Sequence, residues 1–259
     1  MREARPDVIC LQEVRAPLSA IPPEVLDGYH LSYHEGDQPG RAGVAVLSRE
    51  LPEAVRIGFG DVEFDAQGRY VEVDLAGPEG SSQAPPGTET VDVARISHPL
   101  TVGSLYLPKG AADGPRFANK LRFMAEFAAH AARTAGVPGR EYVVCGDYNI
   151  AETEADLKWW KRYGKAPGFL PIEREWLTAL LADAGLVDVV RLLHPEQDGP
   201  YTWWSWRTSA WNLDAGWRID HQLATPGLAT RAVRGWVDKA TTFDARVSDH
   251  AAVVVDYAF

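Results

Sequence analysis

The chain has 259 residues, of which 46% are hydrophobic and 24% are charged, and its formal net charge is −10. This composition is typical of a folded globular protein, and no apolar run reaches the length needed to cross a bilayer. The acidic balance argues against a general nucleic-acid coat protein, but it leaves room for a local basic surface. Residues 1–14 have no signal-peptide pattern, so we expect a cytoplasmic protein. The length suits one domain over residues 1–259.

Short apolar or alternating runs predict the strands. Residues 7–14 (DVICLQEV) and 43–49 (GVAVLSR) are apolar, whereas 69–75 (RYVEVDL) alternates as a strand with one face in water would. Residues 77–90 are rich in Gly, Pro and Ser and predict a surface loop. Further strand patterns lie at 100–107, 141–145, 218–225 and 250–257.

Two segments predict helices. Residues 116–135 are rich in Ala and end before Gly136 and Pro138, and residues 172–185 are amphipathic. Many strands with few helices between them favour an α+β fold, a two-layer β-sandwich flanked by helices. The only two cysteines, Cys10 and Cys145, lie in apolar runs and are expected to be reduced core thiols.

Polar residues recur where the predicted strands end. They are Glu13 after ICLQ, Asp147 and Asn149 after VVCG, Asp220 in RID, and Asp249 with His250 before the last apolar run. A sandwich brings strand ends together at one rim, and hard oxygen ligands gathered there suit a divalent ion such as Mg²⁺. The alternative is that each one is an ordinary turn residue or cap.

A basic and aromatic segment occupies residues 158–165 (KWWKRYGK). It holds Lys158, Lys161, Arg162 and Lys165 with no acid among them. Cations next to aromatic rings suit contact with DNA phosphates and bases. Arg207, which follows a Trp-rich run, is a further phosphate candidate. A solvated helix end with its aromatic rings in the core is the alternative, and for Trp159 and Trp160 it stays open.

The order of several motifs resembles a known family. LQEV, GDYNIA, GFLPIEREWL, YTWWSWR, RID and SDH occur here in the order found in bacterial exonuclease III and its apurinic/apyrimidinic (AP) endonuclease relatives. That resemblance implies a DNase I-like, four-layer α/β/β/α fold and a monomer. It implies a Mg²⁺- or Mn²⁺-dependent phosphodiesterase of DNA repair that cleaves double-stranded DNA 5′ of abasic sites and degrades it from 3′ ends.

The resemblance also assigns roles, residue by residue. It implies metal binding by the acids and the amide of LQE, GDYN and SDH, namely Glu13, Asp147, Asn149 and Asp249. Catalytic roles are implied for Tyr106, Asp147, Asn149, Asp220 and His250. For DNA contact it implies Lys120 and Trp203, which join Lys158, Lys161, Arg162 and Arg207. His221 follows RID directly, and strand alternation would turn it away from Asp220.

The chain departs from the family at its start. The family opens with a strand ending in W-N, whose asparagine helps to bind the metal, and no such motif precedes DVICLQE here. We therefore expect an N-terminally truncated chain with one ligand fewer. Two alternatives follow: a non-catalytic DNA-binding remnant, or a phosphatase or lipid phosphodiesterase of the same fold, which would not need segment 158–165 or Trp203.

Overall fold

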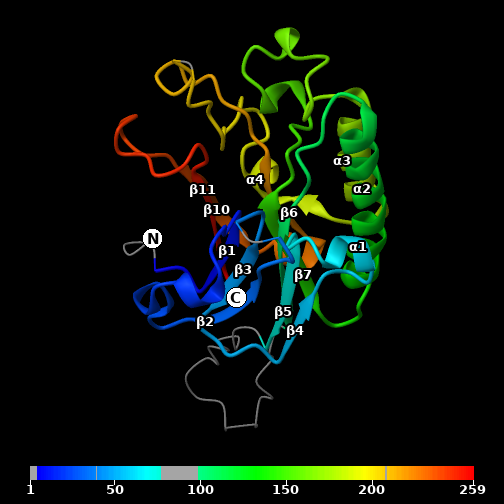
Figure 1. Ribbon diagram of the computed structural model, residues 1–259, viewed down its shortest axis with the longest axis vertical. Helices are drawn as coiled ribbons and strands as arrows, with labels where there is room; N and C mark the ends of the chain where they lie inside the picture. Colours follow the sequence, from blue (N-terminus) through cyan, green and yellow to red (C-terminus); the bar gives the residue numbers. More distant parts are fainter. Residues whose placement is uncertain (1–4, 39, 77–98, 208) are drawn as a thin grey trace, which may run out of the picture.

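The computed structural model describes residues 5–38, 40–76, 99–207 and 209–259. The predicted loop at 77–90 lies outside these residues. Figure 1 shows helices α2 and α3 side by side along one side of the central strands, with the strands β1, β2 and β3 on the other side. The predicted arrangement, a two-layer sandwich flanked by helices, is thus confirmed.

A six-stranded sheet forms the centre of the molecule. Its order is β4-β5-β6-β7-β9-β8. The strands are β4 (Ala54–Ile57), β5 (Tyr70–Leu75), β6 (Leu100–Tyr106), β7 (Glu141–Asp147), β9 (Asp220–Ala224) and β8 (Val187–Asp188). β6 and β7 run parallel, while the other neighbours run antiparallel. The ends of β6 and β7 and the start of β9 therefore lie at one rim.

The second layer holds two smaller sheets. One has the order β1-β3-β2, and the other pairs β10 with β11. Their strands are β1 (Val8–Gln12), β2 (His30–His34), β3 (Val44–Ser48), β10 (Ala232–Asp238) and β11 (Ala252–Tyr257). Val44 and Val46 of β3 pack in one buried cluster with Val71, Val73 and Val102 of the central sheet. Burying such branched side chains stabilises a fold by about 1.5–3 kcal/mol each.

The helices cover the other face of the central sheet. α2 (Gly114–Ala135) buries Phe123 and Phe127, and α3 (Pro171–Asp183) buries Leu177 and Leu180 in the same cluster. Pro lies in the first turn of both helices, where a missing N–H is tolerated. The shorter pieces are α1 (Val62–Asp65), α4 (Val189–Leu193), α5 (Pro226–Ala229) and 3-10 turns at Leu18–Ala20, Pro23–Leu26, Glu154–Asp156 and Trp160–Arg162. None of the helices in the described ranges is long and apolar enough to span a membrane.

The structure differs from the sequence-based expectations in two places. The wet face predicted for 69–75 is wrong, because Tyr70 and Glu72 of β5 are buried and hydrogen-bonded to each other. Strands β2, β4, β8 and β10 were not predicted, because β8 has only two residues and polar or glycine residues hide the period-two pattern in the others. Cys10 and Cys145 are free, as expected.

Candidate active site

Three side chains from separate segments of the chain meet at the rim. Asp147 is the last residue of β7, and it pairs in register with Asp220, the first residue of β9. His250 lies just before β11, and its Nδ1 is 2.8 Å from the Asp220 carboxylate. Its Nε2 lies 3.9 Å from Oδ2 of Asp147. An imidazole thus stands between two carboxylates, with its orientation fixed by Asp220.

The loop after β7 brings Asn149 beside Asp147. The backbone N–H of Asn149 donates to Asp147 Oδ1 at 2.8 Å, and its side-chain amide donates to Asp147 Oδ2 and to the Leu107 carbonyl, both at 3.0 Å. The φ of Asn149 is +50°, a left-handed conformation that costs energy for a residue other than glycine. Asn is among the residues that tolerate it best, which fits a turn that must place both a carboxylate and an amide.

Glu13 and Tyr106 form a second cluster. Glu13 follows β1 directly and also has a positive φ, +55°. The Tyr106 hydroxyl donates to Glu13 Oε1, and Arg15 donates to the same oxygen at 2.7 Å. Arg69, which the sequence did not single out, stacks 4.9 Å from the Tyr106 ring centroid and donates to the Tyr106 carbonyl oxygen. No motif around Arg69 marks it, because its role comes from the pairing of β5 with β6.

Crowded negative charge shifts the acid–base chemistry of this rim. Burial, together with the neighbouring Asp220 carboxylate, raises the pKa of Asp147 to about 7, although His250 opposes the shift. Burial lowers the pKa of His250, but attraction to Asp220, Asp147 and Asp249 outweighs it and raises that pKa to about 10. Burial and the Glu13 carboxylate likewise raise the pKa of Tyr106. At neutral pH, therefore, His250 is protonated and Tyr106 keeps its hydroxyl proton, so both can donate hydrogen bonds, while Asp147 is poised to accept a proton.

Oxygen atoms that could hold a divalent ion are present, but they are spread out. Within the described residues, no three His, Cys, Asp or Glu side chains come close enough together to hold a metal ion by themselves. Mg²⁺ in phosphoryl-transfer enzymes is typically held by one or two carboxylates, with water and substrate phosphates as the other ligands. The side chain of Glu13 is 37% exposed, and its two contacts both use Oε1. The site therefore fits an ion whose coordination the substrate completes.

Trp203 links the site to Asp249. Its indole N–H donates to Asp249 Oδ2 at 2.9 Å, and isolated β-bridges join Trp203 to His250 and to Trp217. The ammonium of Lys109 lies 6.0 Å from the Trp203 ring centroid. Trp203 and Lys109 thus present an aromatic ring and a cation beside His250. Lys109 was not singled out from the sequence, although Tyr106, three residues before it, was.

The basic segment 158–165 approaches the same rim through Trp217. Leu157 forms a β-bridge with Trp217, the residue that also pairs with Trp203. Lys161, Arg162 and Lys165 are exposed, and Lys158 is half-buried. Trp160 packs against a buried cluster, whereas Trp159 is 42% exposed and has the Arg162 guanidinium 5.2 Å from its ring centroid. The alternative of aromatic rings packed in the core therefore applies to Trp160, which is largely a packing residue, and not to Trp159, which is available at the surface.

Two of the predicted DNA contacts differ in position. Arg207 is exposed on the segment between β8 and β9. Lys120 of α2 is fully buried, and its Nζ donates to Glu173 Oε1 at 2.6 Å. The prediction that Lys120 contacts DNA is therefore corrected, because its ammonium has no surface to offer a phosphate. His221 points away from Asp220, as expected, and is bonded to Asp188 and the Ile150 carbonyl.

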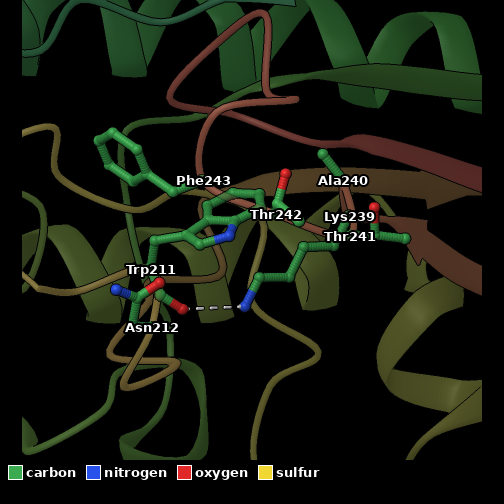
Figure 2. Close-up of a pocket in the computed structure, with 7 residues that line it drawn as sticks. All are labelled: Trp211, Asn212, Lys239, Ala240, Thr241, Thr242 and Phe243. Atoms are coloured by element: carbon green, nitrogen blue, oxygen red, sulfur yellow. Dashed lines mark hydrogen bonds between the residues drawn. The ribbon is translucent and has the colours of Figure 1, made fainter.

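A separate open pocket of about 490 Å³ lies between the segment around Trp211 and the residues that follow β10. Figure 2 shows the Lys239 side chain beneath Trp211, where its ammonium donates to the Trp211 carbonyl oxygen at 3.4 Å. Lys239 also donates to Asp214 at 2.7 Å. None of the residues lining this pocket is a predicted catalytic or metal-binding residue, and its one cation is already paired.

Comparison with known proteins agrees with this arrangement. The model of the Endonuclease/Exonuclease/phosphatase family matches residues 1–250. The exodeoxyribonuclease III of Haemophilus influenzae is 32% identical over 98% of this chain and 90% of its own length. An AP endonuclease structure from Archaeoglobus fulgidus superposes with a TM-score of 0.83 at 27% identity, covering 100% of this chain and 91% of the other. The 3′ phosphatase NExo from Neisseria, bound to a product DNA hairpin, gives a TM-score of 0.81 at 28% identity, covering 98% of this chain and 90% of the other. The chain thus belongs to the endonuclease/exonuclease/phosphatase family and has the DNase I-like fold of its AP endonuclease members.

Proposed function

We propose that this protein is a DNA-repair nuclease that hydrolyses phosphodiesters of duplex DNA at abasic sites and at 3′ ends. The observation that carries the proposal is the in-register pairing of Asp147 with Asp220, with His250 held between them. The names of the relatives, an exodeoxyribonuclease III and an AP endonuclease, support the same substrate class. We propose that the chain acts as a single domain and a monomer.

Each residue of the rim has a part in that reaction. Asp147, with its pKa raised to about 7, orients the attacking water and accepts its proton. The protonated His250 holds the scissile phosphate and donates to its oxygens as negative charge develops. The Asn149 amide uses its two N–H groups on Asp147 and the Leu107 carbonyl, so its part is to hold the Asp147 carboxylate beside the phosphate. The Tyr106 hydroxyl holds Glu13 in place from the opposite side of the rim.

A divalent ion fits the carboxylates of Glu13 and Asp147, and we propose Mg²⁺ or Mn²⁺ for this place. When bound, it supplies positive charge that polarises the phosphate and stabilises the leaving oxygen. Asp249 is a less direct candidate, because its Oδ2 already accepts the Trp203 N–H. Its carboxylate raises the pKa of His250 whether or not it touches the ion.

The test is cleavage of a duplex with a single abasic site. We expect incision 5′ of the site in Mg²⁺, none in chelator, and a rate about 10³-fold or more lower in Asp147→Asn, since one group serves both as base and as orienting residue. Asp183→Asn, an identical change at the exposed end of α3, should cleave like the wild type. Equal cleavage by Asp147→Asn and the wild type would refute the assignment of the base.

The basic segment 158–165 allows a test that distinguishes a nuclease from a phosphatase of the same fold. A duplex-binding protein loses affinity with salt in proportion to the phosphates it contacts, and a small phosphomonoester gives no such dependence. Replacing the exposed Lys161 by alanine should reduce the slope of log K against log salt by about one and weaken binding to any duplex sequence. An unchanged slope would remove this segment from the interface. Binding without any turnover would favour the non-catalytic alternative.

A further inference from the structure

The buried ammonium of Lys120 stands where three segments of the rim meet. Its Nζ donates to the carbonyl of Asn149 at 3.1 Å, to the carbonyl of Lys109 at 3.5 Å, and to Glu173 Oε1 at 2.6 Å. Both side chains of the Lys120–Glu173 ion pair are completely buried. The pair therefore ties the loop after β6 and the loop after β7 to the start of α3.

Glu173 extends this tie with its second oxygen. Glu173 Oε2 accepts the backbone N–H groups of Gly168 at 2.6 Å and Leu170 at 3.1 Å. The Gly168 carbonyl in turn accepts the N–H of Ala151 at 2.8 Å. Asn149 and Ala151 are thus both hydrogen-bonded to one ion pair, Asn149 directly through its carbonyl and Ala151 through Gly168.

At Gly168 and Gly110 the backbone lies too close to neighbouring atoms for any larger residue. A Cβ at Gly168, whose φ is +89°, would lie 2.9 Å from the Asn149 carbonyl oxygen. A Cβ at Gly110, whose φ is +72°, would lie 2.7 Å from Cδ of Lys120. The backbone is therefore shaped around the lysine stem and the Asn149 carbonyl.

Stability alone gives little reason for such a pair. A fully buried ion pair has a desolvation cost that often equals or exceeds its attraction, and apolar replacements of similar size are often neutral or stabilising. Asn149 supplies a different reason, since its left-handed backbone is costly and persists only when its surroundings fix it. The backbone N–H of Asn149 donates to Asp147 Oδ1, so the placement of Asn149 also fixes the orientation of the Asp147 carboxylate.

We propose that Lys120 and Glu173 are positioning residues that hold the Asp147–Asn149 turn in its working geometry, and that Lys120 makes no contact with DNA. This inference rests on the proposed nuclease function of the same site. Neither residue touches the substrate, so both act through the Asn149 carbonyl and the segment 168–170.

The first test replaces both partners with apolar residues, as Lys120→Met with Glu173→Leu, which leaves no unpaired buried charge. We expect kcat for abasic-site cleavage to fall about 10- to 100-fold, because small displacements of reacting groups have effects of that size. KM and the salt dependence of duplex binding should stay unchanged. Arg133→Met, which removes one exposed charge from the same helix, serves as the matched control.

A second readout does not depend on activity or metal. Without its anchor, the turn should open more often, so amide hydrogen exchange at Asn149 and Ala151 should accelerate by about tenfold or more. Exchange at Val144, inside β7, should not change. If the double variant does not fold, Lys120→Met with Glu173→Gln, which also leaves no unpaired buried charge and keeps an acceptor for the N–H groups of Gly168 and Leu170, is expected to give the same changes to a smaller extent.

The outcomes separate the two proposals. An unchanged kcat together with unchanged amide exchange overturns the positioning role. A salt slope reduced by about one would restore Lys120 as a DNA contact and also overturn the inference. Failure of the wild type to cleave the duplex counts against the proposed function alone, because the exchange measurement still decides whether the ion pair holds the turn.

Discussion

Asp147 and Asp188 lie on either side of β9, and both are almost completely buried. Asp188 accepts hydrogen bonds from Arg218 at 2.7 Å and from the Arg191 backbone N–H at 3.0 Å, and His221 Nδ1 lies 3.0 Å away. Within the described residues, the hydrogen bonds that the Asp147 carboxylate accepts come from neutral N–H groups of Asn149. Two carboxylates with the same burial therefore have very different partners.

That difference appears in their acid–base behaviour. Burial raises the pKa of both groups, but the Arg218 guanidinium and His221 reverse the effect and hold the pKa of Asp188 well below its usual range. At Asp147 the neighbouring Asp220 adds to the effect of burial, and the pKa rises to about 7. Burial alone therefore does not make a site: Asp188 has its charge neutralised by the fold, whereas the carboxylate of Asp147 is left for chemistry.

Arg218 with Asp156 and Asp188 forms a region in which buried charges compensate each other, here called the compensated region. Removing its cation should have the largest effect on stability. Arg218 is fully buried between Asp156 and Asp188, with 2.6 and 2.7 Å contacts to their oxygens. Arg218→Met leaves two buried carboxylates without this partner, and we expect the free energy of unfolding to fall by about 3–5 kcal/mol. Urea denaturation at pH 7.5 measures it.

The control for this change is Arg133→Met, which removes an exposed guanidinium and should alter stability by less than about 0.5 kcal/mol. A loss of under about 1 kcal/mol in Arg218→Met would mean that the carboxylates of this region do not depend on it. The contrast with Asp147 would then have no physical basis.

Removing the carboxylate that orients the imidazole should be the next largest effect. His250 has its pKa raised from 6.5 to about 10, so its contribution to stability is complete below about pH 6.5 and is lost as pH rises through about 10. In Asp220→Asn, the pKa of His250 should fall by about two units or more, and the decline of stability in alkali should shrink. NMR titration of the imidazole in metal-free protein gives the pKa directly.

Asp183→Asn, on the far end of α3, should leave the His250 titration unchanged. If the imidazole of Asp220→Asn still titrates near pH 10, then Asp147 and Asp249 rather than Asp220 set its charge. The rim would in that case resemble the compensated region more than its geometry suggests.

Much of this contrast was accessible from the sequence, and some was not. Asp147, Asp220 and His250 stand at strand boundaries, and strand patterning alone brings such residues to one rim. The burial of Lys120 was not accessible, because its partner Glu173 is 53 residues away in a helix of its own. Helical periodicity marks Lys120 only as a polar residue, and its contact depends on how α2 packs against α3.

The compensated region shows the same limit. Arg218 is the first residue of the RID motif, two residues before β9 begins, and nothing in that motif indicates that the arginine is buried. Its two acids come from the 3-10 turn Glu154–Asp156 and from β8, which reach it only through the loops between β7 and β9. Local patterns therefore predict which residues reach a rim, while long-range ion pairs require the packed structure.

The smallest expected effect is that of Asp147→Asn, which should raise the free energy of unfolding, whereas Arg218→Met should lower it. Because its pKa rises from 3.8 to about 7 on folding, the unfolded chain loses this proton first, and the folded state is progressively disfavoured between about pH 4 and pH 7. Asp147→Asn removes that charge, but its amide N–H group meets the N–H groups of Asn149, so part of the gain is lost. We expect the variant to be more stable than the wild type by about 1–2 kcal/mol at pH 8 in chelator, and by much less at pH 4.5. Urea denaturation at both pH values tests this. Equal stability at pH 8 would mean that Asp147 is compensated after all, whereas a gain in stability accompanied by loss of cleavage would mark Asp147 as a charge retained for the reaction at the expense of the fold.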